Sequence, residues 1–538
     1  MTLKKSSAAD SVWLNCEKMR MPENVNDLID YSVEQNAEKV LWTFIESQQV
    51  VTYREFHLRL SQFANYLDSI DVQQGTHVAL MLGNTPEFFY FWLALARLGA
   101  VMVPVNTRYT PDELKFVLND SDATHLITDS HGFELFNQVS KKIFNVNNER
   151  VIIIGSCTEG LSTQRKIDSF SSLMPASKVT GKDLLNIQYT SGTTGFPKGC
   201  MLTHEYWVKG AVIAVGLWPS QPKKILSDSP FFYIDPQWEL LTAIYVGGEL
   251  VAAPRPSLSR FMSYIRDYRI DYCSLWEALA LRPASADDES ETLLYSWTFG
   301  LNPAEHAEVE RRFNLKAREM YAMTEIGCTL VMPWSADHMV GSGSCGIVAP
   351  CREVRLINPD DLQEVAAGEV GELCVRGEGL FRGYYNRDEA NAEAFITDGW
   401  FRTGDLFRMD EEGYFYIVGR IKDMIRRSSE NIAAREVEAT IEQIDGIAAV
   451  AVVGVPDPLR IEEVKAYIVL HDANRSLEPQ EVIEFCKLHL ASFKLPRFIE
   501  FINEMPLTPS GKIAKKKLGE DKADLRVGSY DFEVGRWI

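Results

Sequence analysis

The segment whose residue types most clearly suggest chemistry is Tyr189–Gly199, which reads YTSGTTGFPKG. Its three glycines allow tight turns and a close approach of the backbone to a ligand. Its four serine and threonine hydroxyls and successive N–H groups can surround phosphate oxygens, and Lys198 supplies positive charge. The spacing differs from that of the Walker loop. Taken alone, the segment is also compatible with a polar surface loop, but the apolar strand expected before it and the helix expected after it favour a phosphate loop.

This loop resembles the phosphate loop of the adenylate-forming superfamily, which includes acyl-CoA synthetases, peptide-synthetase adenylation domains and luciferases. Four further motifs follow in the order typical of that superfamily, and Val51–Glu55 and Gly99–Asn106 match landmarks before it. The resemblance therefore extends over nearly the whole chain. It implies that ATP is bound by the loop residues Thr190, Ser191, Gly192, Thr193, Thr194, Gly195 and Lys198.

Tyr321–Glu325 (YAMTE) is similar to the adenine and magnesium motif of the superfamily. The ring of Tyr321 can stack on a purine, and Thr324 can donate a hydrogen bond to the α-phosphate. Glu325 offers a hard oxygen ligand to Mg²⁺, which usually binds through one or two carboxylates and phosphate oxygens. Without the other motifs, a buried tyrosine and a solvated glutamate would be the simpler interpretation. The resemblance assigns Thr324 and Glu325 to catalysis and extends the ATP site to Gly300, Leu301, Asn302, Ala322 and Met323.

Trp400–Asp405 and Gly419–Asp423 resemble the ribose motif and the domain junction of the superfamily. The carboxylate of Asp405 can accept hydrogen bonds from both ribose hydroxyls, although an aspartate in a β-turn is the alternative for this segment alone. The resemblance implies that Arg420 reaches the nucleotide and that Lys422 is the pivot about which the small domain swings. In isolation, a solvated charged linker would look the same.

Pro509–Ile513 (PSGKI) resembles the terminal catalytic motif. The resemblance implies that Lys512 enters the active site and contacts the substrate carboxylate and the α-phosphate. Its charge would compensate the negative charge that develops in the transition state, an electrostatic effect that is usually the largest contribution to catalysis. Without the other motifs, a surface lysine beside the basic run Lys515–Lys517 would be the better interpretation.

Ser428, Ser429 and Glu430 occupy the place of the loop that lines the thiol channel in the superfamily. Glycine usually stands at the position of Ser429. If that glycine uses a positive φ, a serine there is strained. We expect thioester formation to survive this departure.

The acyl pocket is expected to include Tyr233, Ile234 and Trp238, with Leu275–Ala278, which contains Trp276, and Gly300–Asn302 as the opposite walls. Bulky tryptophans favour a small or medium acid, although each could equally pack in the core. Many relatives have glycine at the position of Ala322, whereas alanine occurs in the branch that resembles crotonobetaine/carnitine–CoA ligases. On that basis, aromatic faces with Glu277 or Glu239 nearby could hold a quaternary ammonium group.

Apolar strand-like runs alternate with helical stretches along most of the chain, which predicts an α/β fold with parallel-rich sheets covered by helices. The sequence predicts strands at Val151–Ile154 and Leu184–Tyr189, and a helix at Glu205–Leu217. After Gly419 a smaller α+β unit is expected. We therefore predict a large N-terminal domain over residues 1–419 and a small mobile C-terminal domain over residues 420–538.

Composition narrows the function classes further. A net charge of −20 argues against general nucleic-acid binding, which requires a basic face. The most apolar stretch, Phe88–Val105, is interrupted by Arg97, Gly99 and Pro104, so a buried helix and strand are expected there rather than a membrane span. The nine cysteines form no C-x-x-C pair, which fits a reducing cytoplasm. The oligomeric state stays open, with a homodimer among the options.

The resemblance implies an ATP-dependent carboxylate–CoA ligase. With Mg²⁺, the acid and ATP would give an acyl adenylate and pyrophosphate, and CoA would then give acyl-CoA and AMP. The alternative is a stand-alone adenylation enzyme that loads the phosphopantetheine of a carrier protein. A scaffold protein derived from an inactive ligase is less consistent with the joint presence of Lys198, Glu325, Asp405, Arg420 and Lys512.

Overall fold

The structure is a computed structural model that describes residues 16, 18–190, 197–275, 279, 282–285, 288–289, 291–427, 430–471, 477–490, 492–508, 512–520 and 522–538. The chain forms two compact units. The first contains the described residues up to Val354 together with Val375–Phe401 and Glu412–Tyr414. The second contains Arg355–Cys374, Arg402–Glu411 and Phe415–Ile538. The predicted boundary between residues 419 and 420 stays a prediction.

A six-stranded sheet in the first unit has the order β6-β5-β3-β4-β7-β8. Its strands pair in parallel except β8, which is antiparallel to β7. The strands are β3 (His77–Met81), β4 (Val101–Pro104), β5 (His125–Thr128), β6 (Val151–Ile153), β7 (Leu184–Thr190) and β8 (Lys198–Thr203).

A nine-stranded sheet, also in the first unit, has the order β15-β14-β13-β12-β11-β9-β10-β1-β2. Its central strands are parallel, and antiparallel pairs stand at both ends. The strands are β1 (Val40–Phe44), β2 (Gln49–Thr52), β9 (Lys224–Ser227), β10 (Glu249–Ala252), β11 (Tyr272–Ser274), β12 (Tyr295–Thr298), β13 (Lys316–Met323), β14 (Gly327–Val331) and β15 (Ile347–Val348).

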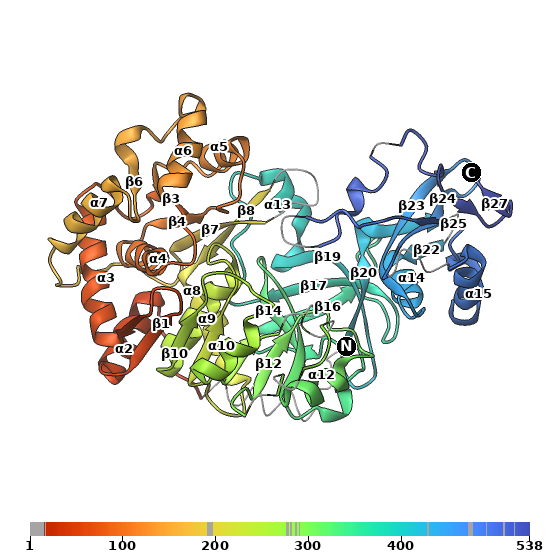
Figure 1. Cartoon of the computed structure of the whole chain (residues 1–538), viewed down its shortest axis with the longest axis horizontal. Helices are drawn as coiled ribbons and strands as arrows, with labels where there is room; N and C mark the ends of the chain where they lie inside the picture. The colour runs from red at the N-terminus through yellow and green to blue at the C-terminus, as the bar shows by residue number, and fades with distance from the viewer. Residues whose placement is uncertain are drawn as a thin grey trace. The chain divides into compact units, whose positions relative to one another are not determined.

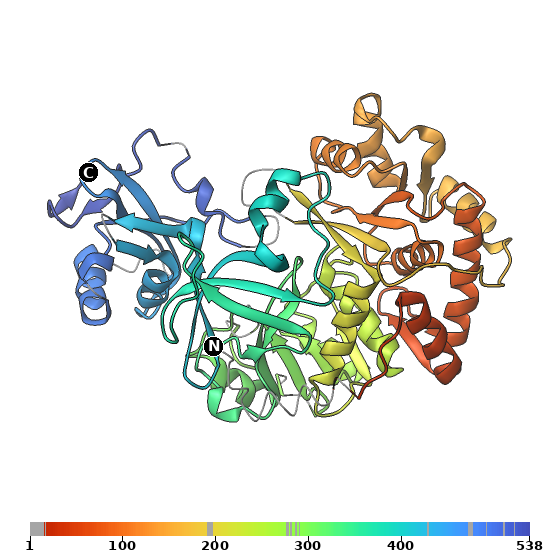
Figure 2. The same cartoon turned by 180° about the vertical axis from the view of Figure 1, so that it is seen from behind.

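Helices cover these sheets, and two of them lie between the sheets (Figure 1). Helix α8 contacts β8 of one sheet and β14 of the other, and it packs along α9, which contacts β9 and β10. Figure 2 shows the same helices from behind. The helices of the first unit are α2 (Val25–Asn36), α3 (Tyr53–Asp68), α4 (Pro86–Leu98), α5 (Pro111–Asp120), α6 (Ser130–Val139), α7 (Thr158–Asp168), α8 (His204–Gly216), α9 (Ile234–Val246), α10 (Phe261–Tyr268), α12 (His306–Phe313) and α13 (Asp388–Ala394).

The apolar stretch from Phe88 to Val105 forms a buried helix followed by a buried strand, as predicted. Helix α4 begins at Pro86, and the missing N–H of proline is tolerated there because the first N–H groups of a helix have no acceptor within the helix. Its last residue, Leu98, is followed by Gly99, whose φ of +72° favours glycine. Within the described residues, no helix combines the length and apolar character that a membrane crossing requires. The α/β class with helix-covered, largely parallel sheets is confirmed.

A five-stranded sheet has the order β16-β17-β19-β18, and β20 also pairs with β19. Its strands are β16 (Arg352–Ile357), β17 (Gly371–Gly377), β18 (Phe395–Ile396), β19 (Trp400–Met409) and β20 (Phe415–Arg420).

The second unit is built on a seven-stranded sheet, against which α14 (Ala434–Ile441) and α15 (Pro479–His489) enclose an apolar core. The strands are β21 (Met424–Arg427), β22 (Glu430–Ala433), β23 (Ile447–Asp457), β24 (Ile461–Leu470), β25 (Phe498–Phe501), β26 (Tyr530–Asp531) and β27 (Arg536–Trp537). The expected small α+β unit is therefore present.

Candidate active site

The predicted phosphate loop joins two antiparallel strands. Thr190 ends β7 and pairs with Lys198, which begins β8. The loop residues between them, including Ser191, Gly192, Thr193, Thr194 and Gly195, lie outside the described residues. The helix predicted at Glu205–Leu217 is confirmed as α8 (His204–Gly216), and a strand that was not predicted from the sequence, β8, lies between it and the loop. Gly199 lets β8 pack closely on β7, since a Cβ there would lie 2.6 Å from the Ile187 side chain. Positive charge therefore enters from a strand end rather than from a helix N-terminus.

Lys198 and Glu325 meet around a third residue, Tyr384. The Tyr384 hydroxyl donates to Glu325 Oε1 across 2.9 Å, and Lys198 Nζ lies 4.8 Å from the centre of the Tyr384 ring. Glu325 is only 7% exposed, and it lies in the turn between β13 and β14. The first unit thus brings together the lysine predicted to bind phosphate and the carboxylate predicted to bind Mg²⁺.

The segment that carries Tyr384 runs antiparallel to β8 and forms an isolated bridge with it, between Tyr384 and Cys200. Met201 N donates to Gly383 O across 3.0 Å, and Tyr385 N donates to Gly199 O across 2.8 Å. Its other edge is fixed by Phe381 N, which donates to the backbone oxygen of Glu325 across 2.8 Å. Sequence reasoning missed Tyr384, because its partners are distant in the chain and the only local signal is a tyrosine pair after a glycine.

Gly300, Leu301 and Asn302 form a turn that is tied to the strand of the adenine motif. The carboxylate of Glu319 accepts from Gly300 N and Leu301 N, each across 2.9 Å, and from Thr298 Oγ1 across 2.7 Å. Gly300 has a φ of +81°, which favours glycine. Glu319 lies on β13 two residues before Tyr321, so this one strand positions both predicted nucleotide-binding segments.

Tyr321, Ala322 and Met323 end β13, and Thr324 follows in the turn to β14. The pairing of β13 with β14 has an irregularity between Tyr321 and Ala322. Tyr321 is largely buried, and its hydroxyl lies 3.1 Å from Met323 Sδ.

In the second unit, β19 and β20 pair Asp405 with Arg420. Arg420 Nε lies 2.7 Å from Asp405 Oδ1, and Asp405 is almost fully buried. Lys422 follows in a short 3₁₀ helix, Ile421–Asp423. The structure therefore brings together the residues predicted to bind ribose and the nucleotide, and it places the predicted pivot directly after them.

Lys512 is exposed in the second unit, whereas Lys198 and Glu325 belong to the first. Its backbone is held by Thr508, whose N–H donates to Lys512 O across 2.7 Å and whose hydroxyl accepts from Lys512 N across 3.1 Å. Residues 509–511 lie outside the described part of the chain.

The predicted thiol loop is only partly described. Strands β21 and β22 pair as a hairpin in which Arg427 faces Glu430, and Ser428 and Ser429 between them lie outside the described residues. The hairpin is anchored by Arg427, whose Nε donates to the buried Glu463 across 2.7 Å.

The predicted acyl-pocket residues lie at and after the start of α9. Tyr233 precedes the helix, Ile234 is its first residue, and both are half-buried. Trp238 packs against α8, with its ring 6.1 Å from that of Tyr206, and Gly210 provides the space because a Cβ there would lie 2.9 Å from the indole nitrogen. Trp276 and Glu277 lie outside the described residues.

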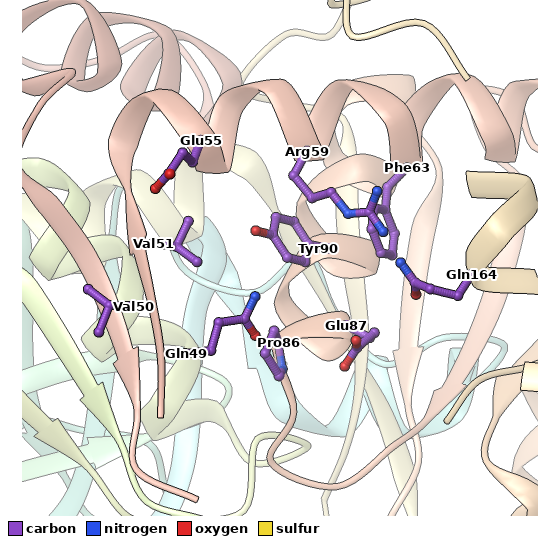
Figure 3. Close-up of a pocket in the computed structure, with 10 residues that line it drawn as sticks. All are labelled: Gln49, Val50, Val51, Glu55, Arg59, Phe63, Pro86, Glu87, Tyr90 and Gln164. Carbon is purple, nitrogen blue, oxygen red and sulfur yellow. The ribbon is translucent and has the colours of Figure 1, made fainter. Parts of the chain in front are cut away.

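A pocket of about 350 Å³ lies elsewhere in the first unit, between β2, α3, the start of α4 and α7 (Figure 3). Tyr90, Glu55, Glu87 and Arg59 are among the side chains that surround it. None of the predicted site residues lines this pocket, so the candidate site is identified by its side chains rather than by the size of a cavity.

Glu325 suits a magnesium ion that is held mainly by its substrate. In the described part of the chain, no group of three or more His, Cys, Asp or Glu side chains could form an all-protein metal site. A hard carboxylate oxygen near the lysine predicted to bind phosphate would fit Mg²⁺, which usually takes one or two carboxylates and completes its shell with phosphate oxygens and water.

Comparison with known proteins identifies sequence families and relatives that are similar to this chain. A sequence profile described as AMP-binding enzyme matches residues 29–385, and one described as AMP-binding enzyme C-terminal domain matches residues 436–512. The chain is 31% identical over 524 residues to the crotonobetaine/carnitine–CoA ligase of Citrobacter koseri, with 92% of this chain and 99% of the relative covered. It is 33% identical over 494 residues to the enzyme of that name from Proteus mirabilis, with 87% and 92% covered.

Solved structures of similar fold include ATP-bound MatB from Rhodopseudomonas palustris, with a TM-score of 0.83, 25% identity, and 94% of this chain and 100% of the other covered. The anthranilate–CoA ligase AuaEII in complex with anthranoyl-AMP aligns with a TM-score of 0.82 at 24% identity, with 94% and 98% covered. The latter likeness concerns the fold alone.

Proposed function

Because this chain belongs to the AMP-binding enzyme family and is an AMP-forming acid–thiol ligase that uses ATP, Mg²⁺ and CoA, we propose that it activates a small or medium carboxylic acid at the Lys198–Tyr384–Glu325 cluster. The observation that carries the proposal is the 2.9 Å hydrogen bond from Tyr384 to Glu325 beneath the Lys198 ammonium group. Tyr384 thus lies between Lys198, the first residue of β8, and the carboxylate suited to Mg²⁺.

In the first half-reaction, the acid's carboxylate attacks the α-phosphate of ATP and pyrophosphate leaves. Lys198 neutralises phosphate charge, and Asp405 accepts hydrogen bonds from the ribose. Lys512 approaches the carboxylate and the α-phosphate, where its charge offsets that of the transition state. Glu325 would hold Mg²⁺, which when bound would offset part of the negative charge of the phosphates.

In the second half-reaction, the CoA thiol attacks the acyl carbon and AMP leaves. We assign the path of the thiol to Ser428, Ser429 and Glu430, of which Ser428 and Ser429 lie outside the described residues. Lys512 must withdraw for this step, and we propose that the small domain, residues 420–538, turns about Lys422 between the half-reactions. The pivot follows β20 directly, which is consistent with a hinge at the end of an element.

For the acid itself, we propose a substrate with a cationic group, of the crotonobetaine or carnitine type. The support comes from the names of the relatives and from Glu239. Burial raises the pKa of Glu239 well above its usual value, and the charges of Asp235 and Asp228 raise it further. A ligand cation would offset this accumulation of acidic groups, which lies where β9 ends at Ser227. Parallel sheets commonly bind ligands beyond the carboxyl ends of their strands.

We also propose that the enzyme works in the cytoplasm. All nine cysteines are free thiols, as expected in a reducing compartment.

A panel of acids assayed for AMP release tests the substrate proposal. We expect crotonobetaine or carnitine to give a higher kcat/KM than butyrate or a cinnamate. A preference for either uncharged-chain acid would overturn the cationic substrate while leaving the ligase intact. Replacing CoA by a phosphopantetheinylated carrier protein would reveal the carrier-loading alternative if only the carrier accepts the acyl group.

A further inference from the structure

Two buried amide side chains, Gln188 and Gln237, donate hydrogen bonds to the segment Phe231–Tyr233, which directly precedes α9. Gln188 Nε2 donates to Phe232 O across 2.7 Å. Gln237 Nε2 donates to Phe231 O and to Tyr233 O, each across 3.0 Å. Three successive backbone carbonyls therefore accept hydrogen bonds from two side chains that are 4% and 0% exposed.

The orientation of these amides is fixed by a chain of donors. The indole N–H of Trp92 can only donate, and it lies 2.9 Å from Asn186 Oδ1, so the nitrogen of Asn186 must point the other way. That nitrogen donates to Gln237 Oε1 across 2.8 Å, which leaves the nitrogen of Gln237 to serve the two carbonyls. Each amide has one consistent arrangement.

The segment Phe231–Tyr233 is also hydrogen-bonded to the loop that contains Asn84. Phe231 N donates to Asn84 Oδ1 across 2.9 Å, and the amide nitrogen of Asn84 donates to Ser229 O across 2.9 Å and to Ala253 O across 3.0 Å. Both the N–H and the carbonyl of Phe231 are thus bound by side chains. The backbone at Phe231–Tyr233 has little freedom to rearrange around a ligand.

This network is more than ordinary core packing. Burying an amide is unfavourable unless its hydrogen bonds are made, and apolar side chains would fill the same space without that requirement. The network also links two functional segments, because Asn186 and Gln188 lie on β7, the strand that leads into the phosphate loop. Gln237 lies on α9, just after the predicted acyl-pocket residues Tyr233 and Ile234.

We propose that Gln188 and Gln237 are positioning residues that determine acid selectivity, by holding Phe231–Tyr233 as a pre-formed wall of the acyl pocket. The inference rests on the proposed function, since it requires that the acid lies against this wall. A rigid wall discriminates by size: one methylene in a well-fitted pocket changes kcat/KM by about 10- to 200-fold. Without the hydrogen bonds from Gln188 and Gln237, the backbone of Phe231–Tyr233 can shift to accommodate a longer acid. The preference for the shorter acid is then lost.

The test compares Gln188→Met and Gln237→Met with the unmodified chain. The measurement is acid-dependent ATP–pyrophosphate exchange with the preferred acid and with its homologue one methylene longer. We expect the ratio of the two kcat/KM values to fall by about fivefold or more, which lies within the discrimination that one methylene provides. The KM for ATP should change by less than about twofold, because neither side chain touches the predicted nucleotide residues in the described part of the chain.

Gln62→Met is the matched control, since Gln62 on α3 also donates to two backbone carbonyls, at Asp168 and Phe170. Its selectivity ratio should equal that of the unmodified chain. If Gln188→Met does not fold, Gln188→Asn replaces it, because the shorter side chain keeps a polar group but cannot reach Phe232 O.

An equal loss of kcat/KM for both acids, with the ratio unchanged, would show that the network serves only stability and would overturn the inference. Absence of acid-dependent exchange in the unmodified chain would instead contradict the proposed function. The two failures are therefore distinguishable.

Discussion

The hydroxyl of Tyr384 donates to Glu325 Oε1 across 2.9 Å, and the ring of the same tyrosine lies 4.8 Å from Lys198 Nζ. A single side chain thus orients the carboxylate predicted to bind Mg²⁺ and faces the ammonium group predicted to bind phosphate. Groups that orient a metal ligand commonly affect metal affinity or activity by about 10- to 100-fold. Tyr384 is therefore a positioning residue whose loss has a measurable signature.

Tyr384→Phe removes the hydrogen bond to Glu325 but keeps the aromatic face beneath Lys198. We expect the Mg²⁺ concentration for half-maximal ATP–pyrophosphate exchange to rise about tenfold. Mn²⁺ binding in the presence of ATP, followed by electron paramagnetic resonance, should weaken in parallel. Tyr385→Phe is the control, because the Tyr385 hydroxyl bonds Asp122 instead, across 3.0 Å. Equal metal dependence in both variants would contradict the role of Tyr384.

Lys512→Ala should separate the two half-reactions. Loss of a charge that acts only in the adenylation transition state is expected to lower exchange by about 10²- to 10³-fold. Conversion of a supplied acyl adenylate and CoA to acyl-CoA should remain within about threefold of the unmodified rate, because Lys512 is proposed to be withdrawn in that step. Lys517→Ala, in the adjacent basic run, should change neither rate. If Lys512→Ala lowers both half-reactions alike, the proposed alternation is wrong.

Ser429→Gly tests the one departure in the predicted thiol loop. Arg427 and Glu430 pair across β21 and β22, so two residues connect these strands. Glycine usually stands at the position of Ser429 in the superfamily, and a position that uses a positive φ costs a residue other than glycine roughly 1–2 kcal/mol. We expect the KM for CoA to fall by about two- to fivefold, while exchange in the absence of CoA stays constant. An unchanged KM for CoA would mean that the serine at position 429 does not affect the use of CoA.

Much of this arrangement follows from the sequence, and the exceptions have physical reasons. The alternation of apolar runs predicts the sheets, and Pro86 and Gly99 bound α4 as local capping rules require. The helix predicted at Glu205–Leu217 is confirmed as α8, but strand β8 before it was not predicted, because its pairing with β7 depends on the turn between them rather than on a local pattern. Tyr384 meets Glu325 across 59 positions of sequence, and no local pattern encodes such a contact.

The amide network was missed for the same reason. Asn186 and Gln188 are polar residues within the apolar strand β7, so from the sequence alone they only weaken the prediction of a buried strand. Only the fold brings them to Gln237 and to the carbonyls of the acyl segment. The predicted thiol-loop serines and Trp276 lie outside the described residues, so those assignments remain predictions.

His204 makes the stability of the first unit depend on pH. Val25 N donates to His204 Nδ1 across 3.4 Å, and burial lowers the pKa of His204 from 6.5 to about 4. Between these values the unfolded chain binds a proton that the folded chain does not, so stability decreases as the pH falls through this window. The maximal loss is about 3 kcal/mol.

We therefore expect the thermal midpoint to fall more steeply from pH 6.5 to pH 4 in the unmodified chain than in His204→Asn. His131→Asn, at an exposed histidine on α6, is the control and should follow the unmodified profile. Parallel profiles for the unmodified chain and His204→Asn would show that His204 does not contribute.

The most direct measurement is product analysis after the purified chain is mixed with ATP, Mg²⁺, CoA and a panel of small and medium organic acids. A ligase of this kind should release AMP, pyrophosphate and acyl-CoA in equal amounts with at least one acid, and essentially no AMP when the acid is omitted. Release of ADP in place of AMP, or no acid-dependent AMP with any acid of the panel, would contradict adenylate formation at the Lys198–Tyr384–Glu325 cluster.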